Sequence, residues 1–271
     1  MSYREEYMLP QQEGISEYVW GVLVQRAHES ISAEPKLAGM LEDVVCTRNN
    51  LAESVAARLS RKLSRRDMSR DELEPLIRAL LRDNPQVVDC IATDLHACFS
   101  RDAACTCMLE PLLFFKGFHA LATYRVSHIL WNQGRYLMAL LFQSIGSEVF
   151  GVDIHPAARI GCGIMLDHGT GIVVGETSII ENCVSMLHAV TLGGTGKETG
   201  NRHPIVRSGV MLGAGAKILG RVEIGECAKV AASSVVLMDV AAHTTVAGVP
   251  AVVVGSTGED APAMCMQQGL V

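Results

Sequence analysis

The sequence predicts an α+β protein in which an all-α domain precedes a left-handed parallel β-helix of hexapeptide repeats with one extruded loop. Two changes in composition and one repeat predict this division. Only 5 of the 25 glycines precede residue 146, and every Trp, Tyr and Phe lies at or before Phe150. Aliphatic residues then recur every six positions. We therefore expect a helical N-terminal domain over 1–150, a β-helix over 151–255 and a flexible tail over 256–271.

Helical periodicity marks the first half of the chain. Ser69 followed by Glu72 forms a capping-box pattern, which is typical of a helix start. Leu73, Ile77 and Leu80 follow at the spacing of one helix face. Prolines at other positions can open further helices in their first turn. The expected helices cover residues 16–33, 36–48, 50–64, 70–83, 86–100, 111–133 and 135–149.

A repeat of six residues marks the second half. This spacing fits neither a helix, with 3.6 residues per turn, nor a flat strand, with two. It predicts a β-helix in which three six-residue units close one coil, around an interior too thin for aromatic rings. Ser178 is the weak point, because an aliphatic residue is expected there. The repeat includes Ile154, Ile160, Leu166, Ile172, Val184 and Val190, and later Leu212, Ile218, Ile224, Val230 and Val236.

The repeat is interrupted between Val190 and Leu212. These residues are 22 positions apart, which is not a multiple of six, and the segment is rich in Gly, charged and polar residues. A solenoid tolerates an extruded loop without disturbing its stack, and such loops often carry function. We expect an active-site loop here.

Composition excludes several classes of function. The net charge of −6 argues against nucleic acid as a partner, since binding phosphates requires a basic face. No apolar run approaches the roughly 18 residues that span a membrane, and the first residues lack a signal-peptide pattern. The nine cysteines are scattered without a CxxC pair, which favours reduced thiols and a cytoplasmic location.

Several strings in the sequence carry a family resemblance. They are VDIHPA (152–157), LDH (166–168), GIVVGE (171–176), TLGGTGK (191–197), RHP (202–204), GAGAKILG (213–220) and AGVP (247–250), with SRD (100–102) and KGFHAL (116–121) in the helical half. In these strings the chain resembles the serine acetyltransferase branch of the hexapeptide acyltransferases. The loop together with LDH is more specific than the six-residue repeat, which many acyltransferases share.

The resemblance implies a function and an assembly. It implies direct transfer of an acetyl group from acetyl-CoA, a co-substrate, to the hydroxyl of L-serine, with no bound cofactor and no metal. The products are O-acetyl-L-serine and CoA, the reaction is the first step of cysteine biosynthesis, and L-cysteine is expected to inhibit it. The resemblance further implies trimers, joined in pairs as hexamers, and docking of the C-terminal tail into cysteine synthase. Here the tail is short and ends in Val271.

The chemistry requires a base near the serine hydroxyl. A histidine is suited to this role because its pKa lies near neutral pH, and a carboxylate on its other nitrogen would stabilise the imidazolium. The resemblance places His168 as the general base and Asp153 as its partner. Because they are 15 residues apart, they fall on adjacent coils near one edge. His168 as a purely structural turn residue and His188 as a rival base remain alternatives.

The other site residues also follow from the resemblance. Arg202 and His203 would hold the serine carboxylate, with His203 counted among the catalytic residues, and Asp102 and Asp167 would bind the ammonium. Arg202 as a solvated charge and Asp102 as an ordinary helix-end acid are the alternatives. The residues expected to contact acetyl-CoA are Gly194, Thr195, Gly196, Ala214, Gly215 and Lys229.

Two departures from the family pattern leave the contacts to the CoA phosphates open. Val252 stands where the family often has Arg, and Ser256 where it often has Lys. Three other functions remain as alternatives: acetyl transfer to another hydroxyl, a zinc carbonic anhydrase on the same fold, and a non-catalytic scaffold for cysteine synthase. The carbonic anhydrase is disfavoured because the β-helix lacks two histidines spaced five apart.

Overall fold

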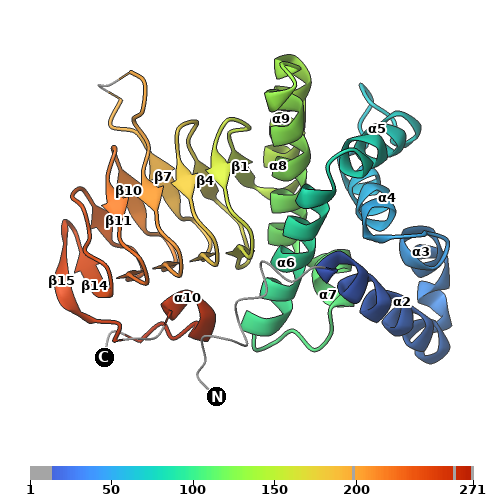
Figure 1. The fold of residues 1–271 in the computed structure, drawn as a ribbon, viewed down its shortest axis with the longest axis horizontal. Coiled ribbons are helices and arrows are strands. Elements are labelled where there is room, and N and C mark those ends of the chain that lie inside the picture. The colour runs from blue at the N-terminus through green and yellow to red at the C-terminus, as the bar shows by residue number, and fades with distance from the viewer. Residues whose placement is uncertain (1–13, 197–198, 259–260, 270–271) are drawn as a thin grey trace.

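The computed structural model describes residues 14–196, 199–258 and 261–269. It confirms the predicted class, with helices at one end and a parallel β-helix at the other (Figure 1). The last long helix, α9 (Tyr136–Phe150), leads into the first strand, β1 (Val152–Ile154), through Gly151 alone. Gly151 has a left-handed backbone with φ of 66°, which glycine adopts without a Cβ clash and which allows this sharp change of direction.

The helical region follows the predicted pattern with two differences. The expected helix over 36–48 is divided, because the Glu42 carbonyl accepts hydrogen bonds from both the backbone N–H (3.0 Å) and the hydroxyl (2.8 Å) of Thr47. The expected helix over 111–133 is broken at Phe115, which is extended with ψ of 109°. The helical elements before α9 are α2 (Ile15–Ala33), η2 (Pro35–Leu37), α3 (Ala38–Leu41), η3 (Glu42–Cys46), α4 (Leu51–Leu63), α5 (Arg70–Arg82), α6 (Pro85–Arg101), α7 (Leu109–Phe114) and α8 (Lys116–Asn132).

The β-helix consists of three sheets whose short strands stack in parallel from coil to coil. The sheet orders are β1-β4-β7-β10-β13, β2-β5-β8-β11 and β3-β6-β9-β12-β14-β15, and only β15 runs antiparallel to its neighbour. After β1, the strands are β2 (Arg159–Ile160), β3 (Met165–Leu166), β4 (Ile172–Val174), β5 (Ile179–Ile180), β6 (Ser185–Met186), β7 (Thr191–Gly193), β8 (Ile205–Val206), β9 (Met211–Leu212), β10 (Lys217–Leu219), β11 (Glu223–Ile224), β12 (Lys229–Val230), β13 (Val235–Val236), β14 (Thr244–Gly248) and β15 (Ala251–Ser256).

The strand register shows that the coils differ in length at two places. An ordinary coil takes 18 residues, as in the pairing of Val173 with Thr191. The first coil takes 20, since Met165 pairs with Ser185, and the extra residues fall in the corner over 167–171. The pairing of Thr191 with Lys217 spans 26 residues and contains the extruded loop. Both insertions lie in segments that carry predicted site residues.

The longer first coil explains the weak point of the repeat. The six-residue pattern counted without a break puts Ser178 in an aliphatic position. In the structure Ile160 pairs with Ile180, so the aliphatic position moves two residues along the chain. Ser178 is buried beside it, in the place that Ala158 takes one coil earlier. The expectation of an aliphatic residue at 178 was wrong because the corner over 167–171 shifts the register.

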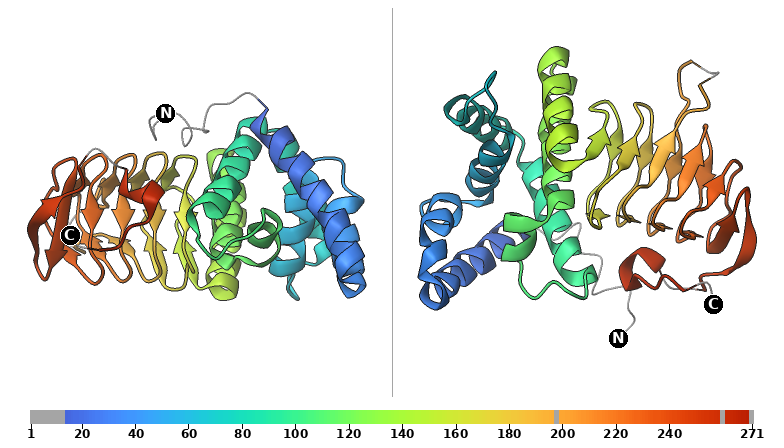
Figure 2. Two further views of the ribbon diagram at one scale, coloured as in Figure 1. Left: turned by 90° about the horizontal axis from the view of Figure 1, so that it is seen from below. Right: turned by 180° about the vertical axis from the view of Figure 1, so that it is seen from behind.

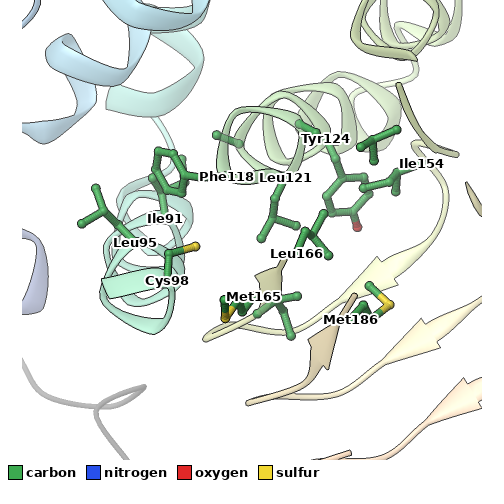
Figure 3. Close-up of a cluster of buried hydrophobic side chains, with 14 of the residues drawn as sticks. Ile91, Leu95, Cys98, Phe118, Leu121, Tyr124, Ile154, Met165, Leu166 and Met186 are labelled. Carbon is green, nitrogen blue, oxygen red and sulfur yellow. The ribbon is translucent and has the colours of Figure 1, made fainter. Parts of the chain in front are cut away.

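Helices α6 and α8 pack against the first coils and form one continuous core with them. Figure 3 shows Leu95 and Phe118 on the helical side and Leu166 and Met186 on the β-helix side of this cluster, all four buried. A buried ion pair reinforces the contact, with Arg125 Nε 2.6 Å from Asp94 Oδ2. Asp94 Oδ1 also accepts the backbone N–H of Ile164 at 2.9 Å, which joins α6 directly to the first coil.

A disulfide joins the same two regions. It links Cys90 of α6 to Cys162 of the first coil, with their Cα atoms 4.8 Å apart. The expectation that every cysteine is a free thiol was therefore wrong. The pair is separated by 72 residues and has no spacing signal, because the contact arises only when α6 packs on the coil.

The segment after β15 lies along the β-helix. It contains the short helix α10 (Pro262–Cys265), which Figure 2 shows beside the stacked coils. Ala263 is buried, its N–H donates to the Gly209 carbonyl at 3.2 Å, and its carbonyl accepts from Ser185 Oγ at 2.8 Å. Val271, on which the predicted docking into cysteine synthase depends, lies outside the described residues.

Across the residues that the structure describes, no helix combines the length and the apolar character that crossing a lipid bilayer requires.

Candidate active site

The inserted corner between β3 and β4 presents His168 to solvent. The His168 side chain is 76% exposed, and its backbone is left-handed with φ of 56°. Gly169 and Gly171 are left-handed as well, so the chain makes a tight turn that projects the imidazole away from the coil. For a residue with a Cβ this conformation costs about 1 kcal/mol or more, which the surrounding structure must offset.

The start of α8 supports this corner. A Cβ at Gly117 would lie 2.0 Å from the Leu166 carbonyl oxygen, so only glycine permits this approach. Lys116 Nζ reaches the Thr170 hydroxyl from the same helix start. The break at Phe115 is what directs α8 onto the corner. The string KGFHAL therefore lies directly behind the turn that carries His168.

One acidic side chain lies near the His168 imidazole, and a second lies near the first. Its Nε2 lies 3.8 Å from Asp167 Oδ1, and Asp102, at the C-terminal end of α6, acts electrostatically on the same carboxylate. Burial raises the pKa of Asp167, the negative charge of Asp102 raises it further, and the charges of His168 and His188 oppose these effects. The structure thus brings Asp102, Asp167 and His168 into one region.

His188 lies beside the predicted base. Its ring centroid is 6.1 Å from that of His168, with the rings 69° apart. It occupies the equivalent corner one coil later. The sequence supported it only as a rival base, since nothing in the spacing shows that the two rings meet edge to face. Ala214 and Gly215 continue this column of corners, where the Gly215 N–H donates to the His188 carbonyl at 2.9 Å.

Asp153 projects outward from β1, with its two neighbours in the strand buried. Its carboxylate Oδ1 accepts the amide of Gln143 at 2.7 Å. Among the described residues of this protomer, no hydrogen bond or ion pair joins Asp153 to His168. Asp153 is the middle residue of β1 and His168 lies in the corner before β4, so the two make no direct hydrogen bond or ion pair within the described part of one copy.

The extruded loop brings its own polar cluster to the opposite edge of that sheet. Arg202 pairs with Glu176 at 2.7 Å, and Thr177 Oγ1 accepts the backbone N–H groups of Arg202 at 3.0 Å and His203 at 3.1 Å. Lys197, at the end of the TLGGTGK string, lies outside the described residues.

His203 is buried beneath this loop. A Cβ at Gly175 would lie 2.0 Å from its ring, so the close packing depends on that glycine. Burial lowers the pKa of His203, the positive charge of Arg202 lowers it further, and Glu176 opposes them. Its Nδ1 accepts the backbone N–H of Thr177 at 3.1 Å, so the neutral ring carries its proton on Nε2. His203 can therefore donate one hydrogen bond from Nε2.

The predicted site thus divides between two edges of the sheet β1-β4-β7-β10-β13. His168, Asp167 and Asp102 lie at one edge, and Arg202 and His203 at the other. Strands of three residues, such as β4 and β7, separate the edges, which is about 10 Å at roughly 3.3 Å per residue. Of the residues expected to contact CoA, Ala214 and Gly215 lie at the His168 edge, and Gly194, Thr195 and Gly196 at the loop edge.

Lys229 lies elsewhere, on β12 in a different sheet. Its Nζ contacts the carbonyls of Gln267 and Gly269 in the C-terminal segment. Lys217, which lies on the sheet between the two edges, contacts the Ala189 carbonyl and, at 3.1 Å, the Thr191 hydroxyl. Within the described ranges there is no group of three or more His, Cys, Asp or Glu side chains arranged to hold a metal ion.

A parallel β-helix of six-residue units, with an exposed histidine on an inserted corner and an extruded loop, defines a hexapeptide-repeat acyltransferase. The family model described as "Serine acetyltransferase, N-terminal" matches residues 19–123. The serine acetyltransferase of Haemophilus influenzae is 50% identical over 250 residues, which are 92% of this chain and 94% of that protein. That of Escherichia coli K12 is 48% identical over 252 residues, 93% and 92% of the two chains. The chain belongs to the serine acetyltransferase family.

Solved structures agree with this assignment. A serine acetyltransferase in complex with cysteine has a TM-score of 0.91 at 49% identity, covering 93% of this chain and 98% of that one. The enzyme of Brucella abortus in complex with coenzyme A has a TM-score of 0.87 at 45% identity, covering 89% and 96%. The soybean enzyme in complex with serine has a TM-score of 0.86 at 45% identity, covering 89% and 99%.

Proposed function

We propose that the protein transfers the acetyl group of acetyl-CoA to the hydroxyl of L-serine, giving O-acetyl-L-serine and CoA, as the first step of cysteine biosynthesis. The observation that carries the proposal is the inserted corner, which presents His168 beside Asp167 and Asp102. An exposed imidazole next to two carboxylates suits a substrate with both an ammonium group and a weakly acidic hydroxyl. Relatives that bind serine, coenzyme A and cysteine support the same assignment.

In the proposed reaction His168 removes the proton of the serine hydroxyl as the oxygen attacks the thioester carbonyl. Asp153 stabilises the imidazolium that forms. The tetrahedral intermediate then expels the CoA thiolate, which takes the proton from His168. The acetyl group passes directly to serine, and the imidazole returns to its neutral form. Acetyl-CoA is a co-substrate here, and no bound cofactor takes part.

Serine is held through its two charged groups. The Arg202 guanidinium and the Nε2–H of His203 bind the carboxylate, and Asp102 and Asp167 bind the ammonium. L-Cysteine has the same α-ammonium and α-carboxylate groups as L-serine, and its side chain is of similar size. It therefore occupies the same subsite and competes with serine, which is the basis of the feedback inhibition in this proposal.

Acetyl-CoA lies along the edge of the sheet in this proposal. Gly194, Thr195 and Gly196 on the loop and the corner residues Ala214 and Gly215 allow the pantetheine arm to approach the backbone closely. Lys229 is the candidate for a CoA phosphate, and it would have to exchange its present contacts with the C-terminal segment for that role.

One complete site requires two copies of the chain. Because His168 and Arg202 lie at opposite edges of one sheet, we propose that each site combines the His168 edge of one copy with the loop of its neighbour in a trimer.

In this proposal the domain over 1–150 joins two trimers, and the C-terminal tail docks into cysteine synthase. A cytoplasmic location belongs to the same proposal, and the Cys90–Cys162 disulfide is the observation against it.

An acceptor panel tests the function. Release of the CoA thiol from acetyl-CoA is followed with L-serine, L-homoserine, a galactoside and no acceptor. We expect turnover with L-serine to exceed that with every other acceptor by about 100-fold or more. The galactoside lacks the ammonium and carboxylate groups, and L-homoserine carries its hydroxyl one carbon further from them, which displaces it from the base. Turnover with the galactoside equal to that with serine would reject the proposal.

A further inference from the structure

The carboxylate of Asp153 has a dedicated partner on α9. Gln143 Nε2 donates to Asp153 Oδ1 at 2.7 Å, and both residues line a cavity of about 460 Å³ between α9 and β1. Gln143 lies two turns before the end of α9, and Gly151 folds β1 back so that the outward side of the strand faces that helix. The half-buried amide therefore reaches the one polar side chain of β1.

We propose that Gln143 is a positioning residue, which fixes the Asp153 carboxylate so that its second oxygen faces the imidazole of His168. This inference rests on the proposed function, in which Asp153 is the partner of the base. The amide occupies Oδ1 and leaves Oδ2 for the imidazole N–H. A carboxylate held in one rotamer loses less conformational freedom when the imidazolium forms, so the contact lowers the barrier to proton transfer.

A neutral donor suits this role better than a charged one. An Arg or Lys at position 143 would form an ion pair and offset the negative charge that stabilises the imidazolium. The amide orients the carboxylate and leaves its charge intact.

The test compares Gln143→Met with Asp153→Asn and with the double variant. Methionine keeps the length and the helix preference of glutamine and removes the donor. We expect Gln143→Met to lower kcat about 10-fold with KM for serine unchanged, the scale of one lost hydrogen bond to a charged group. Asp153→Asn should lower kcat further. The double variant should have the same kcat as Asp153→Asn alone, because both substitutions act through one carboxylate.

Ser144→Ala is the matched control, since Ser144 lies on the same side of α9 and lines the same cavity. It should keep wild-type kcat and KM. The inference fails if Asp153→Asn is impaired while Gln143→Met retains wild-type kcat, if the loss appears in KM alone, or if the two losses multiply in the double variant. If Asp153→Asn itself is fully active, the assignment of Asp153 in the proposed function fails first, and the inference with it.

Discussion

At the scale of single residues, His168 and His119 illustrate how the fold gives opposite roles to two side chains of the same type. His168 is exposed on a corner, whereas His119 is buried in α8 behind the same corner. The His119 Nε2 lies 2.7 Å from the Leu112 carbonyl oxygen, and burial lowers the pKa of His119 to about 3. A histidine held neutral in this way contributes to stability and takes no part in proton transfer near neutral pH.

The lowered pKa of His119 predicts a loss of stability in mild acid. In the unfolded chain a histidine takes up a proton below about pH 6.5, and in the folded protein His119 does so only near pH 3. The contribution of neutral His119 to the free energy of unfolding is therefore complete above pH 6.5 and falls as the pH is lowered toward 3. Between pH 7 and pH 5 we expect His119 to account for about 2 kcal/mol of lost unfolding free energy.

Urea unfolding at pH 7 and pH 5 measures this contribution. His119→Gln keeps a donor for the Leu112 carbonyl and cannot titrate, so its stability should depend less on pH than that of the wild type. His28→Gln, at an exposed position on α2, is the control and should leave the pH dependence unchanged. An unchanged pH dependence in His119→Gln would contradict the expected linkage.

At the scale of elements, the start of α8 and the corner over 167–171 behave as one unit. The extended Phe115 ends α7 and redirects the chain, so that Gly117 rests on the Leu166 carbonyl. Asp102 reaches the same corner from the end of α6, next to the buried Arg101, whose Nη1 donates to Ser185 Oγ at 3.1 Å. Two helix ends thus fix the positions of the acidic groups around His168.

Gly117→Ala tests this arrangement. The added Cβ would lie 2.0 Å from the Leu166 oxygen, so the helix start and the corner must separate. We expect a loss of about 1–3 kcal/mol in unfolding free energy, as for other overpacked sites, and a fall in kcat of about 10-fold or more as His168 moves. Calorimetry and the thiol-release assay measure the two effects.

Gly21→Ala is the control for this substitution. Gly21 lies within α2, and a Cβ there meets no atom within 4 Å. Alanine should therefore stabilise the helix by about 0.5–1 kcal/mol and leave turnover unchanged. Wild-type kcat in Gly117→Ala would show that the contact between α8 and the corner does not position the base.

At the scale of the whole molecule, the division of the site between two edges of one sheet predicts complementation between copies. His168→Ala and Arg202→Ala should each lose about 100-fold or more in turnover. If each site combines edges from two neighbouring copies, random mixed assembly restores about a quarter of the sites, because one pairing in four joins two intact edges.

The measurement is thiol release after the two variants are unfolded together and refolded as a mixture. The same variants refolded apart and then combined provide the control and should stay inactive while the assemblies do not exchange. Activity no greater than the sum of the separate variants would show that one chain holds the whole site. Light scattering of the wild type measures the trimer or hexamer directly.

Many features followed from the sequence alone because their cause is local. The six-residue spacing and the absence of aromatic residues predicted the β-helix, since each short strand must place an aliphatic side chain in a thin interior. The helix starts followed from caps and prolines. The extruded loop followed from a break in the six-residue count. Through the resemblance, its string RHP pointed to Arg202 and His203, and the string LDH before it pointed to His168.

The tertiary structure decided what depends on distant segments meeting. The break at Phe115, the Cys90–Cys162 disulfide and the hydrogen bond from Gln143 to Asp153 have no signal in local spacing. Each results from packing α6, α8 and α9 against the first coil. Composition and periodicity determine which elements form, because these act over a few residues. The closeness of side chains from different elements is decided only by the register and direction in which those elements pack.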